Sequence, residues 1–519
     1  MPGRSAERPG WRFPASRISP CGSASNNERH ESAPDKEEVQ LKTTQEVERW
    51  GIFELTLHGP SGGCPFADAQ VIARFANGRR MAEAEGFYDG DGCYRIRFMP
   101  DAEGVWTYAT ESGCAELDGV KGQFVCVRPS PGNHGPVRVK DSTRFQYADG
   151  SGFVPIGTTC YAWHRQSAER QERTLRTLAG APFNKVRMHV LPGDEDAAAG
   201  AEPARYPFAG TPEQGFDYRA LQPDYFAHLE RKVGELLRLG IEAELILFRP
   251  DGAGGIPGSG AMAPEDDERY LRYVVARLGA YRNVWWSLAD EYDAIDRRPA
   301  DWARLFRILQ ECDCGAHLRS IRNRQAWYDF GVPWVTHASI RQEEVRVASD
   351  ATKQYEKPVV IDDCGSEGNL DDRWSSLTAE EMLCRIWEGH CRGGYVTHSE
   401  TLLSAEGTVW RWQGGELLGD CASRIAFMRG ILEDAPGHVA YGKDRLDAAT
   451  LEASGEYYLQ YFGPHRFAYR VFDLPEGKYA VDIIDTWNMT VTPLDGLFEG
   501  RFRIDLPGKL YYAVRIRRV

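Results

Sequence analysis

Eight short apolar runs alternate with amphipathic stretches of helical length through the middle of this chain. The runs have the length of buried strands, and most of the stretches between them have Ser, Thr, Asp or Pro near the start, as helices do. Strands that alternate with helices pair in parallel through right-handed crossovers. Eight of them over about 250 residues predict a (β/α)8 TIM barrel, an α/β fold, rather than an open sheet. The predicted strands are residues 153–159, 183–190, 241–248, 283–289, 318–321, 333–339, 357–363 and 394–400, and the predicted helices are residues 167–181, 223–240, 264–280, 300–315, 342–356 and 378–391.

The regions on either side of these repeats have a different pattern. Between Val47 and Val127, apolar and polar residues alternate in short runs broken by turns, as in a β-sandwich. Residues 129–136 have the composition of a linker, and the last ~80 residues return to the β pattern. We therefore expect four parts: a disordered leader (1–43), an N-terminal β-sandwich (44–130), the barrel (131–435) and a C-terminal β-sandwich (436–519).

Charge and composition exclude several classes of protein. The formal net charge is −14, whereas a nucleic-acid-binding protein is expected to show a basic footprint. No apolar run approaches the ~18 residues that a membrane helix needs, so neither nucleic acid nor a membrane is an expected partner. The N-terminal residues lack the apolar segment of a secretory signal, and the 12 Cys follow no disulfide framework. We therefore expect reduced thiols and a cytoplasmic protein.

One spacing resembles a set of metal ligands, namely Cys312, Cys314 and His317. No second pair of ligands follows at the spacing of a zinc site. The Gly-rich segment 252–260 follows a predicted strand but opens no helix, so it does not predict a phosphate-binding loop. We therefore expect neither a metal nor an organic cofactor.

Polar residues gather where the predicted strands end, which is where a barrel places its working residues. The fourth predicted strand runs into Asp290, Glu291 and Asp293, and the seventh ends in Asp362 and Asp363. Hydrolysis of a glycosidic bond needs two carboxyl groups that flank the bond. Trp163, Trp410 and Trp412 are candidate stacking faces for a sugar. With Trp163 and Trp410, the candidate substrate-binding residues are His164, Arg187, His189, Asp290, His337, His398 and Glu400.

These motifs resemble those of a known family. "VWWSLADEYD" resembles the fourth-strand motif of clan-A retaining glycoside hydrolases, where the Glu is the acid/base. "KPVVIDDCGSEGN" resembles their seventh-strand motif, where the nucleophile lies five residues beyond the Pro. "GTTCYAWHRQ", "NKVRMHV", "WVTHASI" and "GYVTHSET" resemble an apiosidase-like branch of that clan, in which a β-sandwich of uncharacterised function precedes the barrel and another follows it. The resemblance covers roughly residues 45–519 and implies a glycosidase with a carbohydrate substrate.

The resemblance implies Glu291 as the acid/base and Asp363 as the nucleophile. Burial after an apolar strand and the like charge of Asp290 would both favour the protonated form of Glu291. The family usually has Asn in place of Asp290 and Glu in place of Asp363. The shorter Asp363 retreats by about 1.5 Å, away from the ~5–5.5 Å separation of a retaining site and toward the ~6.5–9.5 Å of an inverting one. Glu367 is the alternative second carboxylate.

Ordinary structural roles remain open for several of these residues. Asp290 and Asp293 are candidate caps of the turn after the fourth strand, and His337 and His398 are candidate core histidines. Trp410 is as well suited to packing as to stacking on a sugar. The main interpretation is an exo-acting, retaining glycoside hydrolase of carbohydrate metabolism that cleaves small glycosides or oligosaccharides. A non-catalytic carbohydrate-binding relic and a transglycosylase are the alternatives, and assembly into a homo-oligomer is left open.

Overall fold

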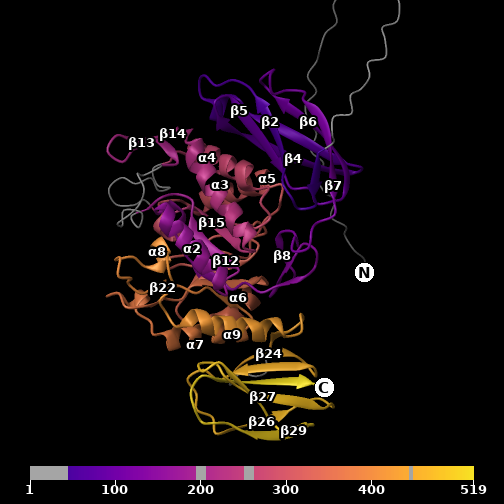
Figure 1. Cartoon of the computed structure of the whole chain (residues 1–519), viewed down its shortest axis with the longest axis vertical. Coiled ribbons are helices and arrows are strands. Elements are labelled where there is room, and N and C mark those ends of the chain that lie inside the picture. The colour runs from indigo at the N-terminus through magenta and orange to yellow at the C-terminus, as the bar shows by residue number, and fades with distance from the viewer. Residues whose placement is uncertain (1–44, 194–205, 251–261, 443–447) are drawn as a thin grey trace, which may run out of the picture. The chain divides into compact units, whose positions relative to one another are not determined.

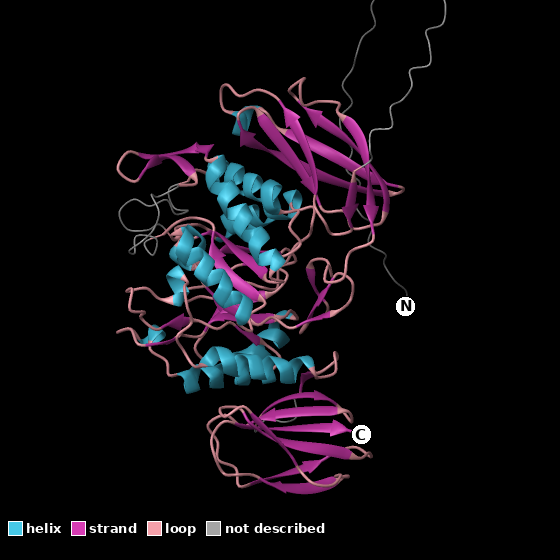
Figure 2. Ribbon diagram, in the orientation of Figure 1, coloured by secondary structure: helices cyan, strands magenta, loops and turns pink. Residues whose placement is uncertain are grey.

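The computed structural model describes residues 45–193, 206–250, 262–442 and 448–519 (Figures 1 and 2). The predicted leader and the Gly-rich segment 252–260 lie outside the described residues. Within those four ranges, no helix is both long enough and apolar enough to cross a membrane. The described elements form three sets that follow one another along the chain.

The first set is the predicted N-terminal β-sandwich, with strand order β1-β7-β6-β3-β4-β5-β2. Strand β4 belongs to two sheets, because its first half pairs with β3 and its second half with β5. Phe53 stacks on Phe124, and Phe75 stacks on Phe98, in the core between the sheets. The elements are β1 (Glu46–Glu48), β2 (Phe53–His58), α1 (Pro65–Asp68), β3 (Val71–Asn77), β4 (Arg80–Gly90), β5 (Cys93–Phe98), β6 (Gly104–Ser112) and β7 (Lys121–Val127).

The second set forms the predicted (β/α)8 barrel. Its parallel strands fall into the groups β11-β12-β15-β16-β17 and β18-β19-β21. Bridges from Arg322 to Ser339 and from Thr158 to His398 join the groups at both seams and close the cylinder. All eight predicted strands are confirmed, at β11 (Gly157–Thr159), β12 (Lys185–His189), β15 (Glu242–Phe248), β16 (Val284–Ala289), β17 (Arg319–Ser320), β18 (Ala338–Arg341), β19 (Val359–Asp363) and β21 (Tyr395–Val396).

All six predicted helices are also present. In α3, Leu229, Val233 and Leu236 are buried at the spacing of one helix face. Helix α9 was not predicted, although its buried Ile425 and Met428 are spaced in the same way. The helices are α2 (Ala168–Gly180), α3 (Pro223–Arg238), α4 (Pro264–Leu278), α5 (Pro299–Cys312), α6 (Val347–Tyr355), α7 (Ala379–Cys391), α8 (Trp410–Gln413) and α9 (Cys421–Glu433), with 3-10 turns η1 (Trp163–Arg165), η4 (Tyr292–Ala294) and η5 (Arg373–Ser375).

Short strand pairs lie outside the barrel sheet. A three-stranded sheet supplies Phe145 and Phe153, which pack on Trp285 inside the cylinder. A parallel pair of Glu367–Gly368 with Glu400–Thr401 joins the chain beyond β19 to the chain beyond β21. These elements are β8 (Val137–Val139), β9 (Phe145–Tyr147), β10 (Gly152–Phe153), β13 (Phe208–Thr211), β14 (Gly215–Leu221), β20 (Glu367–Gly368) and β22 (Glu400–Thr401).

The third set is the C-terminal β-sandwich. It has a six-stranded sheet of order β23-β24-β25-β30-β27-β28 and a separate pair, β26 with β29. Tyr458, Phe472, Tyr479 and Ile504 are buried between them. The strands are β23 (Ala440–Tyr441), β24 (Ala449–Ala453), β25 (Tyr457–Tyr461), β26 (Tyr469–Asp473), β27 (Tyr479–Asp485), β28 (Thr490–Pro493), β29 (Arg501–Asp505) and β30 (Tyr512–Arg518). A barrel flanked by two β-sandwiches is therefore confirmed as the fold.

Candidate active site

The interior of the barrel carries a closed group of four charged side chains from three strands. Arg187 and Lys185 on β12 each lie 2.9 Å from a carboxylate oxygen of Asp362 on β19. Both also pair with Glu244 on β15. All four side chains are at most 2% exposed. Two cations therefore balance two buried anions, and Arg187 serves this group rather than facing solvent.

Asp290 follows β16 and is linked to this group through Arg187. Arg322 Nε pairs with its Oδ1, and Arg187 Nη2 lies 3.2 Å from the same oxygen. His189 lies 3.6 Å from the other oxygen and stacks on the ring of Tyr161. Burial raises the pKa of Asp290, but the Arg322 charge and the His189 contact outweigh it and hold the pKa well below its usual range. Asp290 is therefore an ionised, arginine-bound carboxylate.

Asp363 is the last residue of β19 and is 2% exposed. Arg411 Nη2 donates to its Oδ2 at 2.8 Å, while Arg322 and Arg341 each place a nitrogen 3.4 Å from that oxygen. Burial raises the pKa of Asp363, but the charges of Arg411 and Arg322 lower it to about 2. This carboxylate is ionised at any ordinary pH.

Glu291 is the most exposed of the three acids, with 27% of its side chain open. Its φ of 49° lies in the left-handed region, which is strained for a residue with a Cβ and turns the chain sharply after the strand. Arg341 Nη1 lies 3.1 Å from Glu291 Oε1, and Arg322 and Arg324 each place a nitrogen at 4.0 Å.

Two arginines bring these acids together. Arg341 contacts both Glu291 and Asp363, so the contacted oxygens lie within about 9 Å of one another across one guanidinium. Arg322 contacts the same two acids and Asp290. We call this group, Asp290, Glu291 and Asp363 with Arg322, Arg341 and Arg411, the arginine-paired centre. The carboxylates after the fourth and seventh strands therefore lie close together, and glycosidic hydrolysis uses such a pair of carboxyl groups.

The aromatic residues at the rim differ from those expected. Trp163 and Trp410 are 0% and 1% exposed, so neither offers a ring face to a sugar. The half-buried rings are Trp374, 4.2 Å under the Arg341 guanidinium, and Trp412, beside Tyr161 and Arg411. Trp412 was a sequence candidate, whereas Trp374 and the three arginines of the centre were not.

Two predicted histidines are enclosed in the protein. His337 was expected at the end of the sixth strand, but it precedes β18 and packs edge-on against Trp285 and Phe145. Burial lowers its pKa to about 3, so it is a neutral core histidine. His164 is 1% exposed, and burial holds its pKa well below the usual value. The true end of the sixth strand is Arg341.

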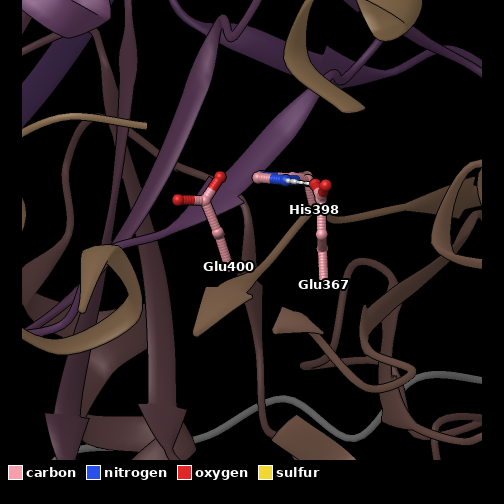
Figure 3. A group of neighbouring side chains, drawn as sticks. All are labelled: Glu367, His398 and Glu400. Carbon is pink, nitrogen blue, oxygen red and sulfur yellow. Dashed lines mark ion pairs between the residues drawn. The ribbon is translucent and has the colours of Figure 1, made fainter. Parts of the chain in front are cut away.

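The remaining predicted residues, Glu367, His398 and Glu400, form a second group (Figure 3). Their side chains converge, with one ligand atom from each lying within 4.8 Å of the others. We call this group the Glu–His–Glu cluster. Glu367 thus lies with His398 and Glu400 and makes no ion pair with the arginines that hold Asp363. The structure brings Glu291 together with Asp363, and it places Glu367 in a different environment.

Comparisons with known proteins agree with this architecture. Residues 140–390 match the family described as "Apiosidase-like, catalytic domain", residues 46–113 match the domain of unknown function DUF5060, and residues 446–517 match DUF5605. A crystal structure of a protein from Bacteroides vulgatus ATCC 8482, assigned as a glycoside hydrolase, is similar with 36% identity and a TM-score of 0.87. The match covers 92% of this chain and 100% of that one.

A family 5 glycoside hydrolase from the same Bacteroides strain shares the fold at 15% identity and a TM-score of 0.60, over 75% of this chain and 95% of that one. A comparison with curated proteins gave no match. The barrel, the paired carboxylates at its rim and these similarities define a glycoside hydrolase. The chain belongs to the apiosidase-like family and is a glycosidase that acts on carbohydrate.

Proposed function

We propose that this glycosidase is a retaining, exo-acting enzyme for small glycosides or oligosaccharides, with Glu291 as acid/base and Asp363 as nucleophile. The observation that carries the proposal is the Arg341 guanidinium, which touches the carboxylates of both residues. These two carboxyl groups come from separate strands and share one guanidinium contact, and hydrolysis of a glycosidic bond needs such a pair of carboxyl groups.

The environment of Asp363 suits a nucleophile. Its pKa of about 2, set by Arg411 and Arg322 against the effect of burial, keeps the carboxylate ionised and ready to attack an anomeric carbon. Arg411 binds both of its oxygens, at 2.8 and 3.5 Å, which fixes the plane of the carboxylate. The bond to the sugar would form at one oxygen and the glycosidic bond would break on the opposite face.

Glu291 suits the acid/base role better than its neighbour Asp290. Asp290 is held ionised by Arg322 and Arg187, so it has no proton to give to a leaving group. Glu291 retains open surface and lies beside exposed Arg324, where a leaving group and a water have access. It would donate a proton to the leaving oxygen and then remove one from the attacking water. The like charge expected from Asp290 is compensated by Arg322, and we assign Asp290 to the positioning of this arginine.

Glu367 is the weaker candidate for the second carboxylate. Its two oxygens accept the N–H groups of Asp420 and Cys421, at 2.7 and 3.2 Å, which fixes it at the start of α9. A nucleophile must reach the anomeric carbon, and a carboxylate tied on both oxygens to a helix start is poorly placed for that. We therefore keep Asp363 in this role. We also retain the division into parts at residues 44–130, 131–435 and 436–519 as a proposal.

A panel of aryl glycosides tests the proposal. The panel contains pyranosides and furanosides in both anomeric forms, and the first-formed sugar is followed by proton NMR before mutarotation. Retention of configuration and release of a monosaccharide from an oligosaccharide are the expected results. Inversion would show that Asp363 acts as a base through water, and mid-chain fragments would show endo action.

A further inference from the structure

The Glu–His–Glu cluster has an unusual balance of charge. Glu367 is 4% exposed and Glu400 is 1% exposed, yet among the described residues no lysine or arginine pairs with either carboxylate. Asp290, Asp362 and Asp363 on the same barrel each contact at least two cationic side chains within 4 Å. Buried charges in proteins are paired with opposite charges or bind metal ions.

The imidazole of His398 adds an independent indication. The side chain is 1% exposed, and its Nε2 has no hydrogen-bond partner in the part of the chain that the structure describes. This nitrogen points at Glu367 Oε2 from 3.9 Å, which is too long for a hydrogen bond (Figure 3). Two atoms that each lie about 2.1 Å from one Zn²⁺ ion are separated by about 3–4 Å. The 3.9 Å between His398 Nε2 and Glu367 Oε2 is therefore a separation that two ligand atoms of one ion can have.

The surroundings fix the orientation of His398. Its ring stacks on Phe183 at 5.1 Å, and its Nδ1 lies 3.2 Å from the hydroxyl of Thr158. That hydroxyl already accepts a hydrogen bond from the indole N–H of Trp410 at 2.9 Å. A hydroxyl oxygen has two lone pairs, so it can also accept Nδ1–H. In that tautomer the lone pair of Nε2 is directed into the cluster, as in histidines that bind metals.

Backbone groups hold the two carboxylates in place. Four consecutive N–H groups of residues 418–421 donate to them, at 2.8 and 3.0 Å for Glu400 and at 2.7 and 3.2 Å for Glu367. Each carboxylate oxygen keeps a second lone pair for another partner. A Cβ on Gly419 would lie 2.4 Å from the Glu367 carboxyl group, so the chain approaches this closely only with glycine there.

We propose that Glu367, His398 and Glu400 bind a divalent transition-metal ion of the Zn²⁺ class, with water completing the coordination. One imidazole and two carboxylates suit such an ion, whereas Ca²⁺ and Mg²⁺ prefer oxygen ligands alone. The three ligand atoms lie within 4.8 Å of one another, so they close on the ion by about 1 Å or less. The site departs from the absence of metal expected from the sequence.

The ion has a structural role. Glu367 follows β19, and both His398 and Glu400 follow β21. The ion therefore links the two segments that β20 and β22 already pair. The adjacent Ser366 and Ser399 hydroxyls contact Arg411 Nη1 at 2.9 and 3.4 Å. Arg411 in turn holds Asp363, so the ion braces the support of the arginine-paired centre without touching substrate.

In the other sequence candidate for a metal site, His317 and Cys312 have partners in the protein. His317 lies 2.8 Å from Asp313 through Nδ1 and 3.1 Å from the carbonyl oxygen of Tyr281 through Nε2. Both ring nitrogens therefore have partners. Cys312 Sγ lies 3.0 Å from the carbonyl oxygen of Ile308. Unlike His317, His398 leaves one buried ring nitrogen without a hydrogen-bond partner among the described residues, and it lies in a group with two carboxylates.

The test uses the full chain, stripped with EDTA and then titrated with ZnCl₂. Elemental analysis after gel filtration should find one Zn²⁺ per chain, and the melting temperature should rise by about 2–5 °C. Titration with CoCl₂ should give the visible absorption of a cobalt ion bound by nitrogen and oxygen. CaCl₂ should produce no shift.

Two variants locate the ion. His398→Gln should lose the bound Zn²⁺ and the thermal shift, and the matched surface control His438→Gln should keep both. Glu400→Gln, which preserves the shape of the side chain, should lose them as well, whereas the exposed control Glu416→Gln should not. If the wild type binds no Zn²⁺ after stripping, or if both cluster variants bind as much as the wild type, the proposal is wrong. Wild-type stoichiometry alone decides the matter if a cluster variant fails to fold.

Discussion

The arginine-paired centre and the Glu–His–Glu cluster lie on the same barrel but balance their carboxylates in opposite ways. In the centre, Asp363 has three guanidinium groups within 3.4 Å. In the cluster, the two oxygens of Glu400 accept backbone N–H groups, and among the described residues no lysine or arginine pairs with this carboxylate. Fixed arginine charges hold a carboxylate ionised whatever is bound, because a guanidinium does not lose its proton in a protein.

This difference suggests different roles for the two groups: catalysis for the arginine-paired centre and structural support for the Glu–His–Glu cluster. In the centre, the carboxylate of Asp363 is buried and held ionised by arginines, whereas Glu291 beside it keeps 27% of its side chain open, a combination that suits reaction with a sugar. Carboxylates enclosed on all sides beside an open histidine nitrogen are equipped to hold an ion. Burial raises the pKa of Glu400, whereas Glu367 has a lowered pKa because its contacts with His398 and with the N–H of Asp420 outweigh burial. The substitutions below test whether the two groups act independently.

Asp363→Asn should have the largest effect. Loss of the nucleophile is expected to lower kcat on the order of 10⁴-fold on the best aryl glycoside from the panel. Steady-state kinetics with active-site titration would measure it, and Asp371→Asn, an exposed change in the following loop, is the control. Zn²⁺ binding should remain at one ion per chain. A variant that keeps more than a tenth of wild-type activity would remove Asp363 from the mechanism.

Glu291→Gln should have the second-largest effect, with a loss of activity that depends on the leaving group. Protonation matters for a poor leaving group, so kcat/KM for an alkyl or phenyl glycoside should fall on the order of 10²–10⁴-fold. A dinitrophenyl glycoside, whose leaving group needs no proton, should lose far less. Glu344→Gln, an exposed change in the segment between β18 and α6, should change neither. Equal losses on both substrates would assign Glu291 to binding instead of proton transfer.

The fold could be predicted from the sequence because its signal is repeated. Eight apolar runs and six amphipathic stretches each give weak evidence, but together they match one architecture. The boundaries were less predictable. His337 was placed at a strand end because "PWVTHAS" reads as one apolar run, yet only Ala338–Arg341 pairs as β18. Because the predicted end of this strand was a few residues too early, His337 was assigned to the rim, where the structure has Arg341.

The acids of the site could be predicted, but their partners could not. Carboxylates stand out after apolar strands because catalysis needs a pair of them. Arg322 follows the predicted strand 318–321, Arg341 follows the motif "WVTHASI" and Arg411 lies between Trp410 and Trp412, but an arginine in such a place does not by itself indicate a partner. Their contacts depend on the closure of the barrel, which brings residues 290 and 363 to the guanidinium of Arg322. Trp163 and Trp410, which were candidates for stacking on a sugar, are buried, and the sequence could not decide between the two roles because the same residue type serves cores and sugar sites.

Acid titration should measure how much the ion pairs of Asp363 contribute to stability. Asp363 has its pKa lowered from 3.8 to about 2, so its ion pairs contribute stability above pH 3.8 that is lost as the pH falls through 2. The contribution is about 2 kcal/mol. Asparagine cannot titrate, so the stability gap between wild type and Asp363→Asn should shrink by that amount from pH 5 to pH 2. Chemical denaturation across this range would measure the gap, and a gap independent of pH would contradict the ion pairing.

Gly419→Ala should have the smallest effect and should act on the cluster alone. The new Cβ meets the carboxyl group of Glu367 at 2.4 Å, and this side chain is buried and tied to the start of α9, so it has little room to move. The expected cost is about 1 kcal/mol of unfolding free energy or more, together with weaker Zn²⁺ binding. Gly430→Ala is the matched control, because a Cβ there meets nothing within 4 Å and alanine favours the α9 helix. If Gly419→Ala were as stable as Gly430→Ala and bound Zn²⁺ equally well, the close approach of the chain to Glu367 would not be what shapes the cluster.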